Sequence, residues 1–211
     1  TKFIIIDRPV GLIMNQLLKD QRKEQILSAA LNVISKKGYD QSRMDDIVTK
    51  SNLSKGAIYW YYKSKKEIYL SLIDHWVSEY SSGVFEEIEN IESPSEKLKK
   101  LFHFFLTQFK NNPVTFKVLV EFWRMASLDI SFNKKLQTVY QDFQDYLINI
   151  IDLGIKKGEF KKVDSRITAL SILINIEGIH WFTLFDKSGV QAQEYIDTIT
   201  DFILTGLKRK V

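Results

Sequence analysis

The stretch Ser42–Ile68, SRMDDIVTKSNLSKGAIYWYYKSKKEI, decides the fold of this chain because it predicts two short helices joined by a tight turn. Met44 and Ile47 are three positions apart, which places both on one face of the first helix. Asn52 lies at the break, and asparagine tolerates the left-handed backbone that such a turn needs. Ser54 can cap the second helix, and a longer third helix begins near the end of the stretch.

The second helix leaves an unusual set of side chains for the surface once Leu53 and Ile58 point inward. A cation, two small residues and three aromatics are poorly suited to water. They suit the major groove of DNA, where bases present hydrogen-bond acceptors and thymine methyl groups. The stretch therefore predicts a helix-turn-helix that binds double-stranded DNA. The exposed positions are Lys55, Gly56, Ala57, Tyr59, Trp60 and Tyr61.

At these residues the chain resembles the tetracycline-repressor (TetR) family of transcriptional regulators. The most recognisable run of that family is Ser-Lys-Gly, then a hydrophobic residue, Tyr and a later aromatic, with a Lys before a long helix. The run occurs here at Ser54–Tyr62, with Lys65 after it. The resemblance covers roughly residues 20–70. Val48 and Asn52 stand where the family usually has Ala and often has Gly, and Val48 adds bulk where the two helices cross.

The resemblance implies how the second helix reads DNA. Lys55 and Trp60 are implied to contact base edges, the lysine at guanine acceptors and the tryptophan at a thymine methyl group. Gly56 and Ala57 are implied to matter because a larger side chain would hold the helix away from the groove.

Phosphate contacts set the register on DNA without reading its sequence. The resemblance implies such contacts for Ser42, Arg43, Tyr59, Tyr61 and Lys65. Ser54 completes the predicted DNA-binding set. Helix capping is a competing explanation for both Ser42 and Ser54. Tyr62 is expected in the core.

The composition indicates long helices. The 211 residues include three prolines and nine glycines, which argues against a β-sandwich. There is no cysteine, so disulfides and cysteine zinc sites are excluded, in agreement with a reducing cytoplasm. No apolar run approaches the ~20 residues that a membrane span needs, so no membrane partner is expected.

Positive charge is concentrated in the N-terminal third of the chain. Residues 1–68 hold 13 Lys and Arg against 7 Asp and Glu, a net charge of +6, whereas residues 69–211 hold 17 against 19, a net charge of −2. A basic head on a near-neutral body suits phosphate binding. The alternative is that the lysines only solvate helical surfaces. The predicted helix-turn-helix in the same residues makes this alternative weaker.

Nine helices are expected, and no strand beyond a doubtful one at residues 3–6. The fold class is therefore all-α, with a three-helix helix-turn-helix head followed by a larger ligand-binding and dimerisation bundle. Besides the two short helices, the expected spans are 20–37, 65–89, 93–110, 113–127, 131–158, 164–185 and 193–208.

The expected domains are an uncertain N-terminal extension at 1–18, a DNA-binding domain at 19–68 and an effector-binding and dimerisation domain at 69–211. Met14 is a hypothetical start, which would make residues 1–13 an upstream extension. A native N-terminus at Met14 would support this hypothesis.

A homodimer is expected because two-fold symmetric dimers place two heads about one helical turn, ~34–36 Å, apart on a palindromic operator. The helices at 164–185 and 193–208 are the expected interface, since the first is too apolar to face water. The alternative is that this helix is the centre of a monomer.

The middle helices are expected to line a pocket for a small-molecule effector. Charged groups in apolar helices are costly unless they are paired or used, although Glu121 and Arg124 are spaced to pair with each other. Aromatic stripes of this kind more often form an ordinary core than a ligand site, and it is the resemblance that favours a ligand site here. The predicted pocket residues are His103, Phe105, Phe109, Glu121, Trp123, Arg124, Glu177, His180 and Trp181.

The resemblance implies a small apolar or amphipathic effector. An aromatic cage with Glu121 or Glu177 suits a cation, and one with Arg124 or His180 suits an anion such as a fatty acid. The sequence leaves this choice open.

The predicted function is a ligand-responsive, dimeric transcriptional regulator, with repression as the expected direction and no cofactor. The alternative is an all-helical small-molecule-binding protein or enzyme with a vestigial DNA-binding head. Against an enzyme stand the lack of Cys, the three separated His and the absence of a phosphate-cradling glycine loop. No repeated Glu-x-x-His is present to hold a metal pair.

Overall fold

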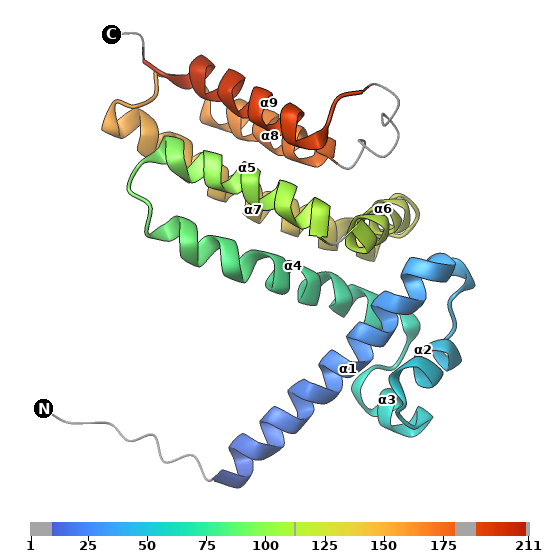
Figure 1. Cartoon of the computed structure of the whole chain (residues 1–211). Coiled ribbons are helices and arrows are strands. Elements are labelled where there is room, and N and C mark those ends of the chain that lie inside the picture. Colours follow the sequence, from blue (N-terminus) through green and yellow to red (C-terminus); the bar gives the residue numbers. More distant parts are fainter. Residues whose placement is uncertain (1–9, 112, 180–188, 210–211) are drawn as a thin grey trace, which may run out of the picture. The chain divides into compact units, whose positions relative to one another are not determined.

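The computed structural model describes residues 10–111, 113–179 and 189–209. Over these residues the chain forms nine helices, and its one β-type pairing is an isolated antiparallel bridge between Phe160 and Lys208 (Figure 1). The predicted all-α class is confirmed. The chain divides into two compact units, residues 1–75 and residues 76–211, here called the first and the second unit. No helix in the described part combines the length and the hydropathy needed to cross a membrane.

The first unit contains the helix-turn-helix. Its helices are α1 (Val10–Gln41), α2 (Met44–Ser51), α3 (Lys55–Tyr61) and the start of α4 (Lys65–Glu89). Helix α1 begins well before the expected position, and its backbone kinks at Gly38 (φ 69°), where the sequence predicts a stop. The fully buried residues that hold these helices together include Ile26, Ile47, Ile58, Ile68 and Leu72.

The turn between α2 and α3 forms as predicted. Asn52 has the left-handed backbone (φ 56°), and the Ser54 side chain accepts a hydrogen bond of 3.2 Å from the Ala57 amide. The start of α2 differs from the expectation, because Arg43 and not Ser42 occupies the N-cap position. Ser42 is buried, and its hydroxyl donates to the Tyr39 carbonyl at 2.6 Å.

The second unit is a helical bundle built from the rest of α4 and five further helices. Helix α7 packs against α5, α6 and α8, and α5 also packs against α9 (Figure 1). Their shared core includes Leu98, Phe102, Leu147, Ile151, Ile172 and Ile196. The helices are α5 (Pro94–Asn111), α6 (Pro113–Leu128), α7 (Ile130–Lys157), α8 (Ser165–Glu177) and α9 (Ala192–Leu207). The last part of the expected 164–185 helix lies outside the described residues.

Helix ends in the second unit follow the sequence signals with one correction. Ser93 and Asp164 accept hydrogen bonds from the first amides of α5 and α8, and Gly158 ends α7 in the left-handed conformation (φ 76°). The cap of α7 is Asp129, whose side chain accepts from the Ser131 amide at 2.8 Å. The expected span started at Ser131, whereas the N-cap is Asp129, two residues earlier.

Phe160 closes one end of the bundle against Gly154. Its ring lies so close to the α-carbon of Gly154 that an added Cβ would overlap it. The Phe160 amide donates to the Gly154 carbonyl at 3.1 Å, and the next amide, of Lys161, donates to the Leu207 carbonyl at 2.8 Å. The absence of a side chain at Gly154 therefore positions the segment between α7 and α8 against the end of α9.

Replacing Gly154 by alanine should lower the free energy of unfolding by about 2 kcal/mol, because the backbone and the Phe160 ring have little room to separate. Urea denaturation measures the change. Gly56→Ala is the matched control: no atom lies within 4 Å of a Cβ at that position, so the same methyl group should stabilise its helix slightly. Equal stability of the two variants would contradict the close packing at Gly154.

Candidate functional site

Helix α3 presents a cationic and aromatic surface. Ile58 is fully buried and Tyr62 packs into the core as expected, which fixes the rotation of the helix about its axis. The opposite side is open: Trp60 is 60% exposed, and Lys55 and Tyr59 are also exposed. The Trp60 and Tyr61 rings meet edge to face with centroids 4.6 Å apart. A large indole held at the surface of a seven-residue helix is arranged for contact with another molecule.

Gly56 lies on this surface, and internal packing does not account for it. No atom of the protein lies within 4 Å of the position a Cβ would occupy, and Gly56 is not among the glycines with a left-handed backbone. An alanine at this position would favour the helix by about 1 kcal/mol. The missing side chain therefore points to a close approach from outside the protein.

Lys55 is held at the surface by an acidic neighbour. Its ammonium group lies 2.8 Å from Asp45 of α2, and this hydrogen bond raises the pKa of Lys55. Both side chains are exposed, and exposed ion pairs contribute little stability. Lys55 can therefore exchange Asp45 for an acceptor on DNA at little cost.

Two of the predicted phosphate contacts are directed inward. The Lys65 ammonium group donates to the carbonyls of Tyr39 (2.7 Å) and Ser42 (2.8 Å) and lies 4.1 Å from the centroid of the Tyr39 ring. Burial lowers the pKa of Lys65. The Ser42 hydroxyl is itself bonded to Tyr39. In this arrangement the Ser42 hydroxyl and two of the three N–H donors of Lys65 are bonded within the protein, whereas Arg43 is exposed.

A cation that the sequence did not suggest lies beside Trp60. The ammonium group of Lys19 is 5.7 Å from the centroid of the Trp60 ring, within range of a cation–π interaction. Because the first helix was expected to begin at residue 20, Lys19 was not placed on it. Because α1 extends further toward the N-terminus, Lys19 joins the surface of α3.

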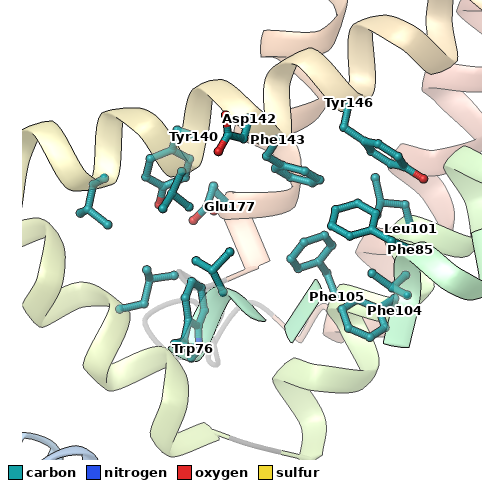
Figure 2. Close-up of a pocket in the computed structure, with 15 residues that line it drawn as sticks. Trp76, Phe85, Leu101, Phe104, Phe105, Tyr140, Asp142, Phe143, Tyr146 and Glu177 are labelled. Atoms are coloured by element: carbon teal, nitrogen blue, oxygen red, sulfur yellow. The ribbon is translucent and has the colours of Figure 1, made fainter. Parts of the chain in front are cut away.

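The second unit contains a cavity of about 300 Å³ that is partly open to solvent. Its walls come from α4, α5, α6, α7 and α8, and most of its surface is apolar. Two predicted pocket residues, Phe105 and Glu177, lie in this lining (Figure 2). The lining residues are Trp76, Val77, Val84, Phe85, Leu101, Phe104, Phe105, Leu119, Leu136, Val139, Tyr140, Asp142, Phe143, Tyr146 and Glu177.

The remaining predicted pocket residues lie elsewhere. His103 faces outward from α5, 3.4 Å from Asp197 of α9, and Phe109 packs against the core of the bundle. Glu121 and Arg124 bind each other through two hydrogen bonds of 2.8 and 2.9 Å, so their charges are matched within α6. Trp123 lies outside the cavity wall, in a shallow groove between α6 and α7. His180 and Trp181 lie outside the described residues.

Two side chains of the lining, Tyr140 and Glu177, form a polar corner of the cavity, and Trp123 bonds to Tyr140 from outside the lining. The Trp123 indole donates to the Tyr140 hydroxyl at 2.5 Å, and Tyr140 is in turn hydrogen-bonded to the Glu177 carboxyl. Burial raises the pKa of Glu177 to about 7, against the lowering effect of the Tyr140 hydrogen bond. Burial also raises the pKa of Tyr140. Sequence reasoning missed Tyr140 because a lone tyrosine in an amphipathic helix has no distinguishing signal.

In the described part of the chain no group of three or more His, Asp or Glu side chains is arranged to hold a metal ion. The two features that stand out are therefore the surface of α3 and the cavity.

Both units match one family. Residues 26–72 match "Bacterial regulatory proteins, tetR family", and residues 92–207 match "Tetracyclin repressor-like, C-terminal domain". The chain belongs to the tetR family of bacterial regulatory proteins. As a TetR-family protein it is a dimeric, ligand-responsive transcriptional regulator that binds DNA, and the alternative of an enzyme with a vestigial head is not favoured.

One relative of this TetR regulator matches it over most of the length of both proteins. The "Fatty acid metabolism regulator protein" of Bacillus subtilis (strain 168) is 23% identical over 189 residues, which is 88% of this chain and 95% of that protein.

Two solved structures share the fold. One is the transcriptional regulator FadR from Bacillus subtilis in complex with stearoyl-CoA (TM-score 0.77, 22% identity, 87% of this chain and 98% of that one). The other is a Saccharomonospora viridis protein in complex with choline (TM-score 0.79, 22% identity, 90% of this chain and 100% of that one). The same architecture thus holds an acyl thioester in one protein and a quaternary ammonium ion in another.

Proposed function

We propose that this TetR-family regulator represses transcription from a palindromic operator and is released when a small apolar or amphipathic molecule fills the cavity. The observation that carries the proposal is the surface of α3, where an exposed Trp60 adjoins a glycine that internal packing does not require. Such a helix leaves room for a groove wall at Gly56 and offers Trp60 and Lys55 to base edges. Cytoplasmic location is part of the same proposal.

The supporting contacts to phosphate come from residues around α3. Arg43, Tyr59 and Tyr61 retain this proposed role, and Lys19 is added because it lies beside Trp60. Ser42, Ser54 and Lys65 are proposed to act indirectly, since each is already hydrogen-bonded within the first unit.

The dimer interface is proposed to lie on α8 and α9. Helix α8 exposes a stripe of aliphatic side chains: Ile167 is 65% exposed and Ile174 is 61% exposed, with Leu170 between them. Phe202 on α9 is 74% exposed. The hydroxyl of Tyr195 on α9 donates to the Asn175 side chain on α8 at 3.1 Å, so the two helices are joined. Side chains of this kind in water favour association with a second copy.

Helix α4 is proposed to carry the signal. It follows the helix-turn-helix directly in sequence, and four of its side chains, from Trp76 to Phe85, line the cavity. A ligand that displaces this wall would alter the equilibrium between binding and non-binding states. A coupling free energy of about 1–3 kcal/mol is typical for such a linkage.

The test is binding of the full chain to DNA. Selection from random duplexes should yield a palindromic sequence, which we expect to bind at least about 1,000-fold more tightly than its scrambled version. Affinity for both duplexes should fall as salt rises, because phosphate contacts release counterions. Equal affinity for the palindrome and the scrambled duplex would refute the proposal.

A further inference from the structure

The charged groups that line the cavity have one sign. The described lining contains two carboxyl groups, Glu177 on α8 and Asp142 on α7, and no lysine, arginine or histidine. Tyr140 and Tyr146, also on α7, are the other titratable side chains facing the cavity. The lining residues of α4, α5 and α6 carry no titratable group. The electrostatic field inside the cavity therefore favours positive charge.

The cavity also has two unlike ends. Figure 2 shows the Glu177 carboxyl beside Tyr140 at one end, and the rings of Phe85, Phe105 and Phe143 gathered toward the other. Phe105 and Phe143 are in ring contact at 5.5 Å between centroids. The polar end suits the head group of an amphiphile, whereas the aromatic end suits its hydrocarbon tail.

The sign of that head group follows from electrostatics. Burial disfavours the charged form of Glu177, as its raised pKa of about 7 indicates. A cation placed against the carboxylate offsets that penalty, and the aromatic rings of the lining attract a cation further. An anionic head group would meet the buried Glu177 carboxyl group at low dielectric constant and the exposed Asp142 at the rim, with no base in the described lining to neutralise it.

We infer that the effector is a cationic amphiphile, with a single ammonium group held by Glu177 and Tyr140 and an apolar tail among the phenylalanine rings. The inference rests on the proposed function, because it takes the cavity to be the effector site. It favours the cation of the two effector classes that the sequence left open, because the predicted acidic residue Glu177 is in the described lining, whereas Arg124 is not and is paired with Glu121.

Three ligands with one tail test the inference. Decyltrimethylammonium and decanoate, each below its micelle concentration, and decanol, below its solubility limit, are titrated into the full chain by calorimetry. The cation should bind about tenfold more tightly than the alcohol, and decanoate should bind most weakly. Decanoate binding as tightly as the cation, or no binding of the cation at all, would overturn the inference.

A Glu177→Gln variant isolates the charge, because it keeps the size and hydrogen-bonding capacity of the side chain. It should lower affinity for the cation about tenfold and leave affinity for decanol unchanged. Asp142→Asn is the matched control at the exposed acidic position and should change cation binding less than about threefold. If Glu177→Gln keeps the preference for the cation, Glu177 is not the counter-charge.

The pH dependence gives a second readout. Cation affinity of the unaltered protein should rise from about pH 6 to about pH 8, as Glu177 loses its proton, and should stay flat in the Gln variant.

Operator binding is measured separately without ligand. If the cation binds but leaves the operator complex intact, the ligand class stands and the proposed release fails. If operator binding itself is absent, the proposed regulator fails whatever the cavity binds.

Discussion

An Ile174→Asp variant is expected to be monomeric in solution and to lose operator affinity by about three orders of magnitude. Ile174 is highly exposed in the single chain, so the substitution removes nothing from the core of the second unit. In the proposed interface, however, it would bury an unpaired carboxylate against the partner's apolar surface. A single head retains mainly the non-specific, phosphate-driven part of DNA binding, which accounts for the size of the loss.

Sedimentation velocity reports the oligomeric state of this variant, and fluorescence anisotropy on the selected palindrome reports its affinity. Leu128→Asp is the matched control, because Leu128 is at least as exposed as Ile174 but belongs to α6, which is not one of the two helices proposed to form the interface. A variant at position 174 that stays dimeric, with circular dichroism unchanged, would exclude the α8 stripe as the interface.

A Gly56→Leu variant is expected to fold at least as well as the unaltered protein and to lose operator affinity on the order of 100-fold, or about 2.7 kcal/mol. The surroundings of Gly56 are open and its helix gains propensity, so stability should not fall. If α3 enters the major groove, the added side chain must push its backbone outward and break contacts on both sides of it.

A graded series strengthens this test, since Gly56→Ala should lose less affinity than Gly56→Leu while both keep their melting temperature. Thr107→Leu, at an exposed position of α5 in the second unit, controls for an added surface leucine. Full operator affinity in Gly56→Leu would mean that this side of α3 does not approach DNA.

The helix-turn-helix was predictable from sequence because its signals are local. Asn52 tolerates the turn, Ser54 caps α3 and Ile58 anchors it, and each acts within a few residues of its own position. The directions of the Ser42 and Lys65 side chains were not predictable, because both depend on the Tyr39 carbonyl at the end of α1. For Lys65 this partner is 26 positions away in the sequence.

The cavity was predictable only in its general chemistry. Aromatic and charged residues in the middle helices suggested it, but periodicity does not tell which side of a helix faces a void and which faces a neighbour. His103 therefore seemed equivalent to Phe105, although the structure turns the first outward and the second into the lining. Glu177 was recognised because a carboxyl group in so apolar a helix is rare, whereas Tyr140 carried no such signal.

The inward direction of Lys65 has a mechanical consequence. Its ammonium group joins the first turn of α4 to the backbone at Tyr39 and Ser42, where α1 gives way to α2. Two hydrogen bonds thus connect the start of α4 to the backbone just before α2. A displacement of the first turn of α4 would therefore act on the backbone before α2 directly, as well as through the short loop after α3.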